Sequence, residues 1–293
     1  MNSAFFLSVT TFIYGLAASL YLAAWVFQKK RLGRVATWMT LCGIAGNCAG
    51  FALRWAESYR MGFGRVPLSN LYESLVFFAL MIAALYLIVE QKYGQRTIGA
   101  FAMPGAFFAM AYASLSPNVS DRIQPLLPAL KSNWLTVHVM TCFIGYAAFA
   151  IAFGLGLMYV IASEKLKQDK GSLSQRLPDR GILDELTHQM VMFGFLFLSA
   201  GIITGAVWAN AAWGRYWGWD PKETWSLITW FVYASLLHAR LMRGWRRGSR
   251  CSPWPGLPAV LYLFRSQPAF QVCTVAGPDR ASSSSLLSGG SSG

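Results

Sequence analysis

Charged side chains are scarce in this chain of 293 residues: Asp, Glu, Lys and Arg make up 13% of it, while 55% of its residues are hydrophobic. Soluble domains carry about 25% charged residues. A chain with so few charges cannot coat a water-facing surface, so the composition nearly excludes a soluble enzyme. It suits a lipid bilayer, where apolar segments of about 20 residues can span.

Acidic residues are scarcer still, with 12 Asp and Glu against 25 Lys and Arg and a formal net charge of +13. Such an excess indicates a nucleic-acid partner when the cations gather on one domain or alternate with exposed aromatics. Here the cations lie between apolar runs. We therefore expect no nucleic-acid partner and interpret the charge as a signal of membrane topology.

The five cysteines form no Cys-x-x-Cys pair and no Cys-x-x-Cys-His motif. Their spacing excludes disulfide exchange of the Cys-x-x-Cys type, and it excludes a c-type cytochrome. Cys42, Cys48 and Cys142 fall within apolar runs, where a free cysteine behaves as a small apolar residue.

Seven apolar runs have the length of membrane helices. They cover residues 5–27, 35–53, 71–89, 98–115, 135–162, 191–208 and 225–241. The first run lacks a basic stretch before it and a small-residue cleavage site after it, so we expect it to be retained. The predicted fold class is all-α, a polytopic membrane helix bundle of about seven spans.

The basic residues predict the orientation of these spans. Sixteen Lys and Arg follow the first, third, fifth and seventh runs, and seven lie in the alternate loops. Cytoplasmic loops are enriched in Lys and Arg. We therefore predict that the N-terminus lies outside and that residues 208–225 lie on the outer face.

Tryptophan is concentrated after the sixth run. Six of the twelve tryptophans fall within residues 208–230, at Trp208, Trp213, Trp217, Trp219, Trp225 and Trp230. An aromatic belt at the lipid headgroups is one interpretation, although a belt needs only one or two aromatics at each helix end. Gly214 and Gly218 leave room for close approach, and Asp220 before Pro221 marks a helix start. The segment therefore also fits a platform for a large planar ligand.

Histidine occurs only three times. His138 lies at the outer end of the fifth run, on the side of the tryptophan-rich segment. His238 lies thirteen residues after Trp225, about 20 Å further in at about 1.5 Å per residue, so the two cannot flank one site. A histidine within a span is a functional candidate, and imidazole is an axial ligand of heme iron. His238 is therefore either a heme or metal ligand or the donor of an interhelical hydrogen bond, whereas His188 is expected to be interfacial.

Four segments together resemble the CcsA (ResC) family of cytochrome c biogenesis proteins, within the heme-handling superfamily that carries a tryptophan-rich WWD segment. The most specific is WANAAWGRYWGWDPKETW at residues 208–225, followed by SLITWFVYASLLHARL. The others are PLSNLYESL at 67–75, WLTVHV at 134–139 and GIITGAVW at 201–208. The resemblance covers about residues 1–245, which we interpret as one transmembrane heme-handling domain.

This resemblance implies a membrane subunit of the system II cytochrome c synthase, which conveys heme across the membrane and presents it at the outer face for thioether attachment to apocytochrome c. The chain would thus be part of a holocytochrome c synthase (heme lyase) complex. Heme b would be its cargo, held outside by the WWD segment with His138 on the iron, while His238 would ligate a heme within the membrane. The implied heme-binding residues are His138, His238, Trp208, Trp213, Trp217, Trp219, Asp220 and Trp225.

The resemblance also implies partners and a location. The partners are the membrane protein CcsB (ResB), apocytochrome c and a thioredoxin-like thiol reductant, all at a lipid bilayer. The implied location is the bacterial cytoplasmic (inner) membrane, with the thylakoid membrane as the alternative.

Two other functions remain open. A heme handover chaperone of the CcmC kind shares the tryptophan-rich segment but hands heme on without attaching it. A transporter unrelated to heme is expected to have broken helices and a polar path through the membrane, and Pro104-Gly105 in the fourth run is one such break.

Residues 246–293 depart from the family. No histidine follows His238, and the apolar run at 257–264 is eight residues long and lies among prolines, so it cannot span. Ser and Gly dominate residues 282–293, which is typical of a flexible linker. We interpret residues 246–293 as an irregular tail of frameshifted or artificial origin, lacking the last span and the second external histidine of the family.

Overall fold

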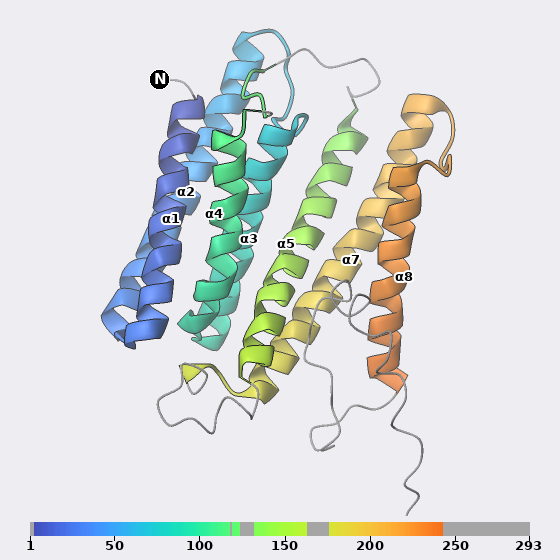
Figure 1. Cartoon of the computed structure of the whole chain (residues 1–293). Coiled ribbons are helices and arrows are strands. Elements are labelled where there is room, and N and C mark those ends of the chain that lie inside the picture. Colours follow the sequence, from blue (N-terminus) through green and yellow to red (C-terminus); the bar gives the residue numbers. More distant parts are fainter. Residues whose placement is uncertain (1–2, 118, 124–131, 163–175, 243–293) are drawn as a thin grey trace, which may run out of the picture. The chain divides into compact units, whose positions relative to one another are not determined.

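The computed structural model of the chain describes residues 3–117, 119–123, 132–162 and 176–242. In these residues the chain forms seven α-helices and one short 3-10 helix, without a strand. They are α1 (Ser3–Phe27), α2 (Lys30–Arg60), α3 (Leu71–Tyr93), η1 (Arg96–Ile98), α4 (Gly99–Leu115), α5 (Asn133–Ile161), α7 (Arg180–Trp213) and α8 (Pro221–Met242). The all-α fold class is confirmed (Figure 1). The predicted tail at 246–293 lies outside the described residues.

Six of the described helices are long and apolar enough to cross a membrane, namely α1, α2, α3, α4 with η1, α5 and α7. The chain is therefore a multi-pass membrane protein. The seventh predicted span forms α8, a helix of 22 residues that is long enough but more polar. Its polarity comes from Lys222 and Glu223 in its first turn, from its Thr and Ser residues, and from His238 and Arg240.

Helix α7 begins eleven residues before the apolar run that predicted it, at Arg180 instead of residue 191. Leu183, Leu186 and Thr187 are buried and lie on one face of this first part. A spacing of three and four residues makes an amphipathic helix, which a search for uninterrupted apolar runs misses.

The helix ends alternate in space. The start of α1 and the ends of α2, α4 and α7 lie at one end of the bundle, and the ends of α1, α3 and α5 lie at the other (Figure 1). We call the first the outer end and the second the inner end, following the predicted orientation.

Helices α5 and α7 cross closely because small residues line their contact. A Cβ atom at Gly145 of α5 would lie 3.1 Å from the Gly194 carbonyl oxygen, and one at Gly201 would lie 2.6 Å from the Cys142 sulfur. Small residues allow such close approach of membrane helices. The crossing brings the outer part of α5 against α7.

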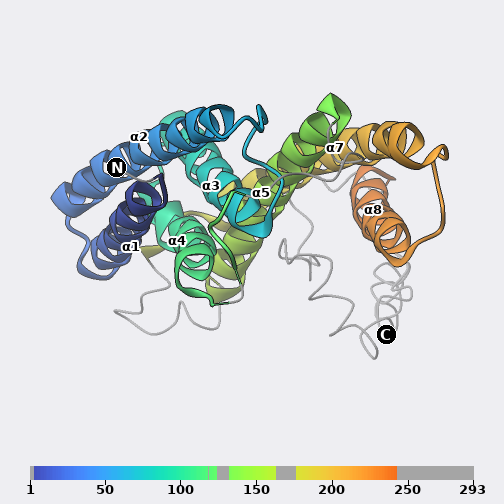
Figure 2. The same ribbon diagram turned by 90° about the horizontal axis from the view of Figure 1, so that it is seen from above.

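Helix α8 lies alongside α7 (Figure 2). The rings of Phe149 of α5 and Tyr233 of α8 stack with centroids 3.9 Å apart. Trp230 Nε1 donates a hydrogen bond of 2.8 Å to Ser199 Oγ of α7. At the inner end Arg240 donates two hydrogen bonds, of 3.0 and 2.7 Å, to the Asp184 carboxylate. These contacts place the connection between α7 and α8 beside the outer end of α5.

The segment PLSNLYESL has a structural role at the outer end. Asn70 caps α3 by accepting a hydrogen bond from the Glu73 backbone N–H. The Glu73 carboxylate forms a buried ion pair of 2.9 Å with Arg54 of α2. Arg54 also donates to the Asp121 carbonyl oxygen. A buried charge requires such pairing, so the motif ties α2, α3 and the segment after α4 together.

Candidate functional site

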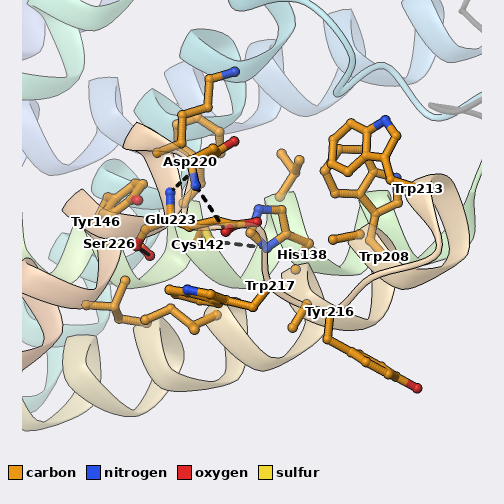
Figure 3. Close-up of a pocket in the computed structure, with 18 residues that line it drawn as sticks. His138, Cys142, Tyr146, Trp208, Trp213, Tyr216, Trp217, Asp220, Glu223 and Ser226 are labelled. Atoms are coloured by element: carbon orange, nitrogen blue, oxygen red, sulfur yellow. Dashed lines mark hydrogen bonds between the residues drawn. The ribbon is translucent and has the colours of Figure 1, made fainter.

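A cavity of about 370 Å³ lies at the outer end between α5, α7, the 214–220 connection and α8 (Figure 3). We call it the outer pocket. Small-molecule and cofactor sites range from about 300 to 1,000 Å³. Each bordering segment contributes a side chain, including His138 from α5, Trp208 from α7, Trp217 from the connection and Ser226 from α8. The pocket exists because three helices and a loop meet here.

Five of the eight predicted site residues line this pocket: His138, Trp208, Trp213, Trp217 and Asp220. Trp219, Trp225 and His238 do not line it. Segments separated by 70 residues in the sequence are thus brought together around one cavity.

The imidazole of His138 is held in one tautomer by α7. Its Nδ1 lies 2.7 Å from the Gly201 carbonyl oxygen. A carbonyl oxygen only accepts hydrogen bonds, so in the neutral ring Nδ1 carries the proton and Nε2 keeps its lone pair. Histidine ligands of metals are commonly oriented by such a bond from the other ring nitrogen. The arrangement prepares His138 Nε2 to bind an electrophilic centre.

Aromatic contacts surround the same ring. His138 and Trp208 are nearly parallel, with centroids 6.4 Å apart and planes 11° apart. Trp208 meets Trp213 edge to face at 4.7 Å. In the view of Figure 3 these two tryptophans lie on one side of His138 and Trp217 lies on the other. The pocket therefore presents indole rings around one imidazole.

The indole N–H of Trp217 is buried and has no hydrogen-bond partner among the described residues. Its ring meets Trp219 edge to face at 5.7 Å. Trp219 has a φ of +56° and is 70% exposed. Trp217 thus offers a donor at the pocket, whereas Trp219 supports it from the solvent side.

Asp220 has a clear local role as the N-cap of α8. Its Oδ1 accepts a hydrogen bond of 2.8 Å from the Glu223 backbone N–H. Glu223 Oε2 in turn accepts from the backbone N–H groups of Gly218, at 2.7 Å, and Asp220, at 3.4 Å. This reciprocal arrangement is a capping box. Both carboxylates line the pocket, but their hydrogen bonds shape the connection that carries Trp217.

One cationic side chain lines the outer pocket among the described residues, namely Lys222. Arg215 does not line it; its guanidinium covers Gly218, where a Cβ atom would lie 2.8 Å from Arg215 Cζ. Cys142 and Tyr146 were not among the predicted site residues, but they line the pocket from α5. Their spacing from His138, four and eight residues, places all three on one helix face and could have identified them.

The chain matches known proteins along most of its length. The family model described as "Cytochrome C assembly protein" matches residues 68–253. Cytochrome c biogenesis protein CcsA of Parasynechococcus marenigrum (strain WH8102) is 38% identical over 272 residues, covering 85% of this chain and 86% of the relative. CcsA of Guillardia theta is 42% identical over 212 residues, covering 66% of this chain and 68% of the relative. The chain belongs to the CcsA family of cytochrome c biogenesis proteins.

A solved structure shows the same fold. The cytochrome c heme lyase CcmF superposes with a TM-score of 0.63 at 17% identity, covering 85% of this chain and 44% of CcmF. Membership of the CcsA family gives this chain a role in cytochrome c maturation, which involves heme. All the residues that line the outer pocket lie within the matched region, residues 68–253.

The structure separates His238 from the outer pocket. His238 lies eighteen residues beyond Asp220 on the continuous helix α8, about 27 Å away at about 1.5 Å per residue. It is exposed, and its imidazole makes no hydrogen bond within the described part of the chain. Tyr233, Leu236 and Leu237 form the face of α8 that packs in the bundle. His238 is therefore exposed on α8, outside the face that packs in the bundle.

Gly205→Ala is expected to lower heme content about fivefold or more, if the outer pocket holds heme through His138. A Cβ atom at residue 205 would lie 2.7 Å from His138 Nδ1 and Cε1. Such overpacking forces a shift of the ring. Heme copurifying with the detergent-extracted protein would be measured by its absorption spectrum. Gly105→Ala is the matched control, because its Cβ meets only Ile82 Cδ1, at 3.8 Å. Equal heme in both variants would contradict the role given to the His138 contact.

Proposed function

We propose that this chain is the membrane subunit of a system II cytochrome c synthase that conveys heme and presents it in the outer pocket for thioether attachment to apocytochrome c. The observation that carries the proposal is His138: its Nδ1 is bonded to Gly201, its Nε2 is free, and its ring stands among tryptophans that line one cavity. Residues 1–245 form the heme-handling domain in this proposal.

The chemistry of heme b matches the outer pocket in three respects. Its flat apolar faces suit the rings of Trp208, Trp213 and Trp217, since aromatic side chains favour stacked and edge contacts. Its iron accepts an imidazole nitrogen as axial ligand, which His138 Nε2 supplies. Its propionates are anionic and suit the Lys222 ammonium and the unpaired indole N–H of Trp217.

A site that presents heme must leave part of it accessible. Trp219 and Trp225 are 70% and 68% exposed beside the pocket-lining residues. We assign them to the rim, where an apocytochrome would meet the heme edge. Amphipathic rings at a membrane surface suit such a rim.

The reaction needs little from the protein beyond positioning. A cysteine thiol of apocytochrome c adds across a heme vinyl group: sulfur bonds to one vinyl carbon, the thiol hydrogen goes to the other, and nothing is oxidised or reduced. The chain binds and orients the heme and sets the iron's environment through His138. Thiols must be reduced beforehand, which is the task assigned to a thioredoxin-like partner.

We assign His238 to a second heme within the membrane, shared with the partner protein CcsB. His238 lies on the exposed side of α8, near Phe231 and Met242, which are 56% and 71% exposed. A second membrane protein covering this face could supply another ligand. We place the complex in the bacterial cytoplasmic membrane; fractionation of a photosynthetic host distinguishes this from a thylakoid location.

Reconstitution tests this function. The chain would be purified with and without CcsB, supplied with heme, reduced apocytochrome c and a thiol reductant, and assayed for thioether-linked heme. Product that requires both subunits is expected. Heme release to apocytochrome without covalent product would indicate a handover chaperone of the CcmC kind, and a complex without any heme would favour a transporter.

Replacing Trp217 and Trp219 together by Ala is expected to lower heme content about tenfold, because stacking area and a hydrogen-bond donor are lost. Membrane insertion should persist, since it depends on the apolar helices. Trp38→Ala is the matched control; this residue lies on α2 and is 69% exposed. If the double variant is expressed less but each inserted molecule carries normal heme, the result would instead support the interpretation of this segment as an aromatic belt.

A further inference from the structure

A second cavity, of about 350 Å³, lies at the inner end of the bundle between the end of α1, the start of α2 and the connection from α3 to η1. We call it the inner pocket. Four cationic side chains line it, and no Asp or Glu does so among the described residues. They are Lys29, Lys30, Arg96 and Arg176. The pocket is separate from the outer pocket in residues and in its end of the bundle.

A buried carboxylate beneath the inner pocket holds one of these cations in place. Glu90 accepts hydrogen bonds from the hydroxyl groups of Tyr21, Tyr86 and Thr37, at 2.7, 2.6 and 2.6 Å. It also accepts a bond of 3.1 Å from Arg96 Nε. Arg96 uses only its Nε in this pair, so its two Nη groups keep their donors for another acceptor.

Arg96 lies where the backbone of α2 gives it room. A Cβ atom at Gly33 would lie 3.1 Å from Arg96 Cδ. The Arg96 side chain is 42% exposed, whereas that of Glu90 is 5% exposed. The guanidinium is therefore anchored on its buried side and open on its pocket side.

Among the described residues, the other charges of the inner pocket have no acidic partner in it. Arg176 donates to the Val26 carbonyl oxygen, a neutral acceptor, and forms no ion pair with another described residue. Helix α2 starts at Lys30 without a side-chain cap and without an acidic residue in its first turn. The partial positive charge of that helix start therefore adds to Lys29 and Lys30. The side chains that line the cavity make it electropositive.

We propose that the inner pocket binds a phosphate ester group, supplied by the headgroup of an anionic phospholipid of the inner leaflet. Basic pockets between membrane helices on the cytoplasmic side commonly bind anionic headgroups. The predicted orientation places this pocket at that leaflet. Guanidinium groups pair with phosphate oxygens in bidentate fashion, and the anchored Arg96 offers its free edge for this contact.

Lipid binding by a specific pocket can be distinguished from lipid attraction by a general excess of cytoplasmic cations. Arg31 and Arg34 are exposed on the same first part of α2 but do not line the cavity. If surface charge alone attracted lipid, removing either pair of cations would have the same effect. This difference defines the test.

Native mass spectrometry of the full chain in neutral detergent, titrated with dioleoyl phosphatidylglycerol, measures the apparent affinity. Lys29→Gln with Lys30→Gln is expected to weaken binding about tenfold or more, since each cation near an anionic headgroup contributes substantially. Arg31→Gln with Arg34→Gln should change it less than about twofold. Gly33→Leu, which fills the space beside Arg96 without changing charge, should weaken it as the lysine pair does.

Inorganic phosphate and phosphatidylcholine distinguish the source of the phosphate. Displacement of phosphatidylglycerol by millimolar inorganic phosphate would keep the anion site but assign it to a soluble phosphate. Equal losses in the two double variants, or equal binding of phosphatidylcholine, would overturn the proposal. If the wild-type chain binds neither phosphatidylglycerol nor phosphate, the proposal is wrong. None of these outcomes depends on heme.

Discussion

His138→Ala is expected to lower heme in the outer pocket at least tenfold, whereas His138→Cys should retain part of it. Alanine removes the only imidazole that lines this pocket among the described residues. A cysteine thiolate can replace imidazole on heme iron, although its shorter side chain places sulfur further from the iron. The absorption spectrum of the protein purified with its partner subunit, together with heme per protein, would measure both effects.

The contrast between the two variants separates ligation from packing. His188→Ala is the matched control, because His188 lies on α7 and does not line the outer pocket. Equal losses in His138→Ala and His138→Cys would show that the ring at residue 138 only packs against Trp208. A shifted absorption band in the cysteine variant alone would establish a bond between this position and the iron.

The second large effect concerns the order of two heme sites. Removing His238 should lower the heme content of the outer pocket in cells more than tenfold. Heme that arrives from the cytoplasmic side would then lack the ligand that holds it within the membrane before it reaches this pocket. Removing His138 should leave a heme at the inner position visible in the spectrum. Heme supplied from outside should restore the outer site in His238→Ala but not in His138→Ala.

The order of the two sites would be refuted by a His238→Ala variant that keeps full heme at the outer site without any supplement. Rescue of both variants by external heme, or of neither, would equally contradict it. Arg240→Gln would control for damage to α8, since Arg240 joins α8 to α7 through Asp184 near the same end. An effect of His238→Ala that Arg240→Gln reproduces would reflect loss of helix packing.

The apolar runs predicted most of the helices because a membrane helix is specified by composition over about 20 residues. They missed the start of one helix for an identifiable reason. The first part of α7 is amphipathic, with Leu183 and Leu186 on its buried face. Helix α8 carries enough polar residues to fall outside the six most apolar helices. The start of α7 depends on what a neighbouring helix covers, which composition does not report.

For the candidate site, the sequence indicated the residues, and the structure showed which of them lie together. The tryptophan density and His138 were visible in the sequence because residue type carries their chemistry. Their meeting in one cavity depends on the crossing of α5 and α7 at Gly145 and Gly194, which brings His138 to the Gly201 carbonyl. Asp220 was predicted as a heme-binding residue, and its hydrogen bond to the Glu223 backbone N–H shows the cap of a helix whose start Asp220 before Pro221 had indicated.

By itself the sequence determined that this is an α-helical membrane protein, and its tryptophan-rich segment indicated the family. These properties follow from local composition and from residue types that recur in a fixed order. The tertiary structure decided the tautomer of His138, the separation of His238 from the outer pocket and the gathering of cations around Arg96. Each of these depends on contacts between residues far apart in the chain, and such contacts arise only when the helices pack.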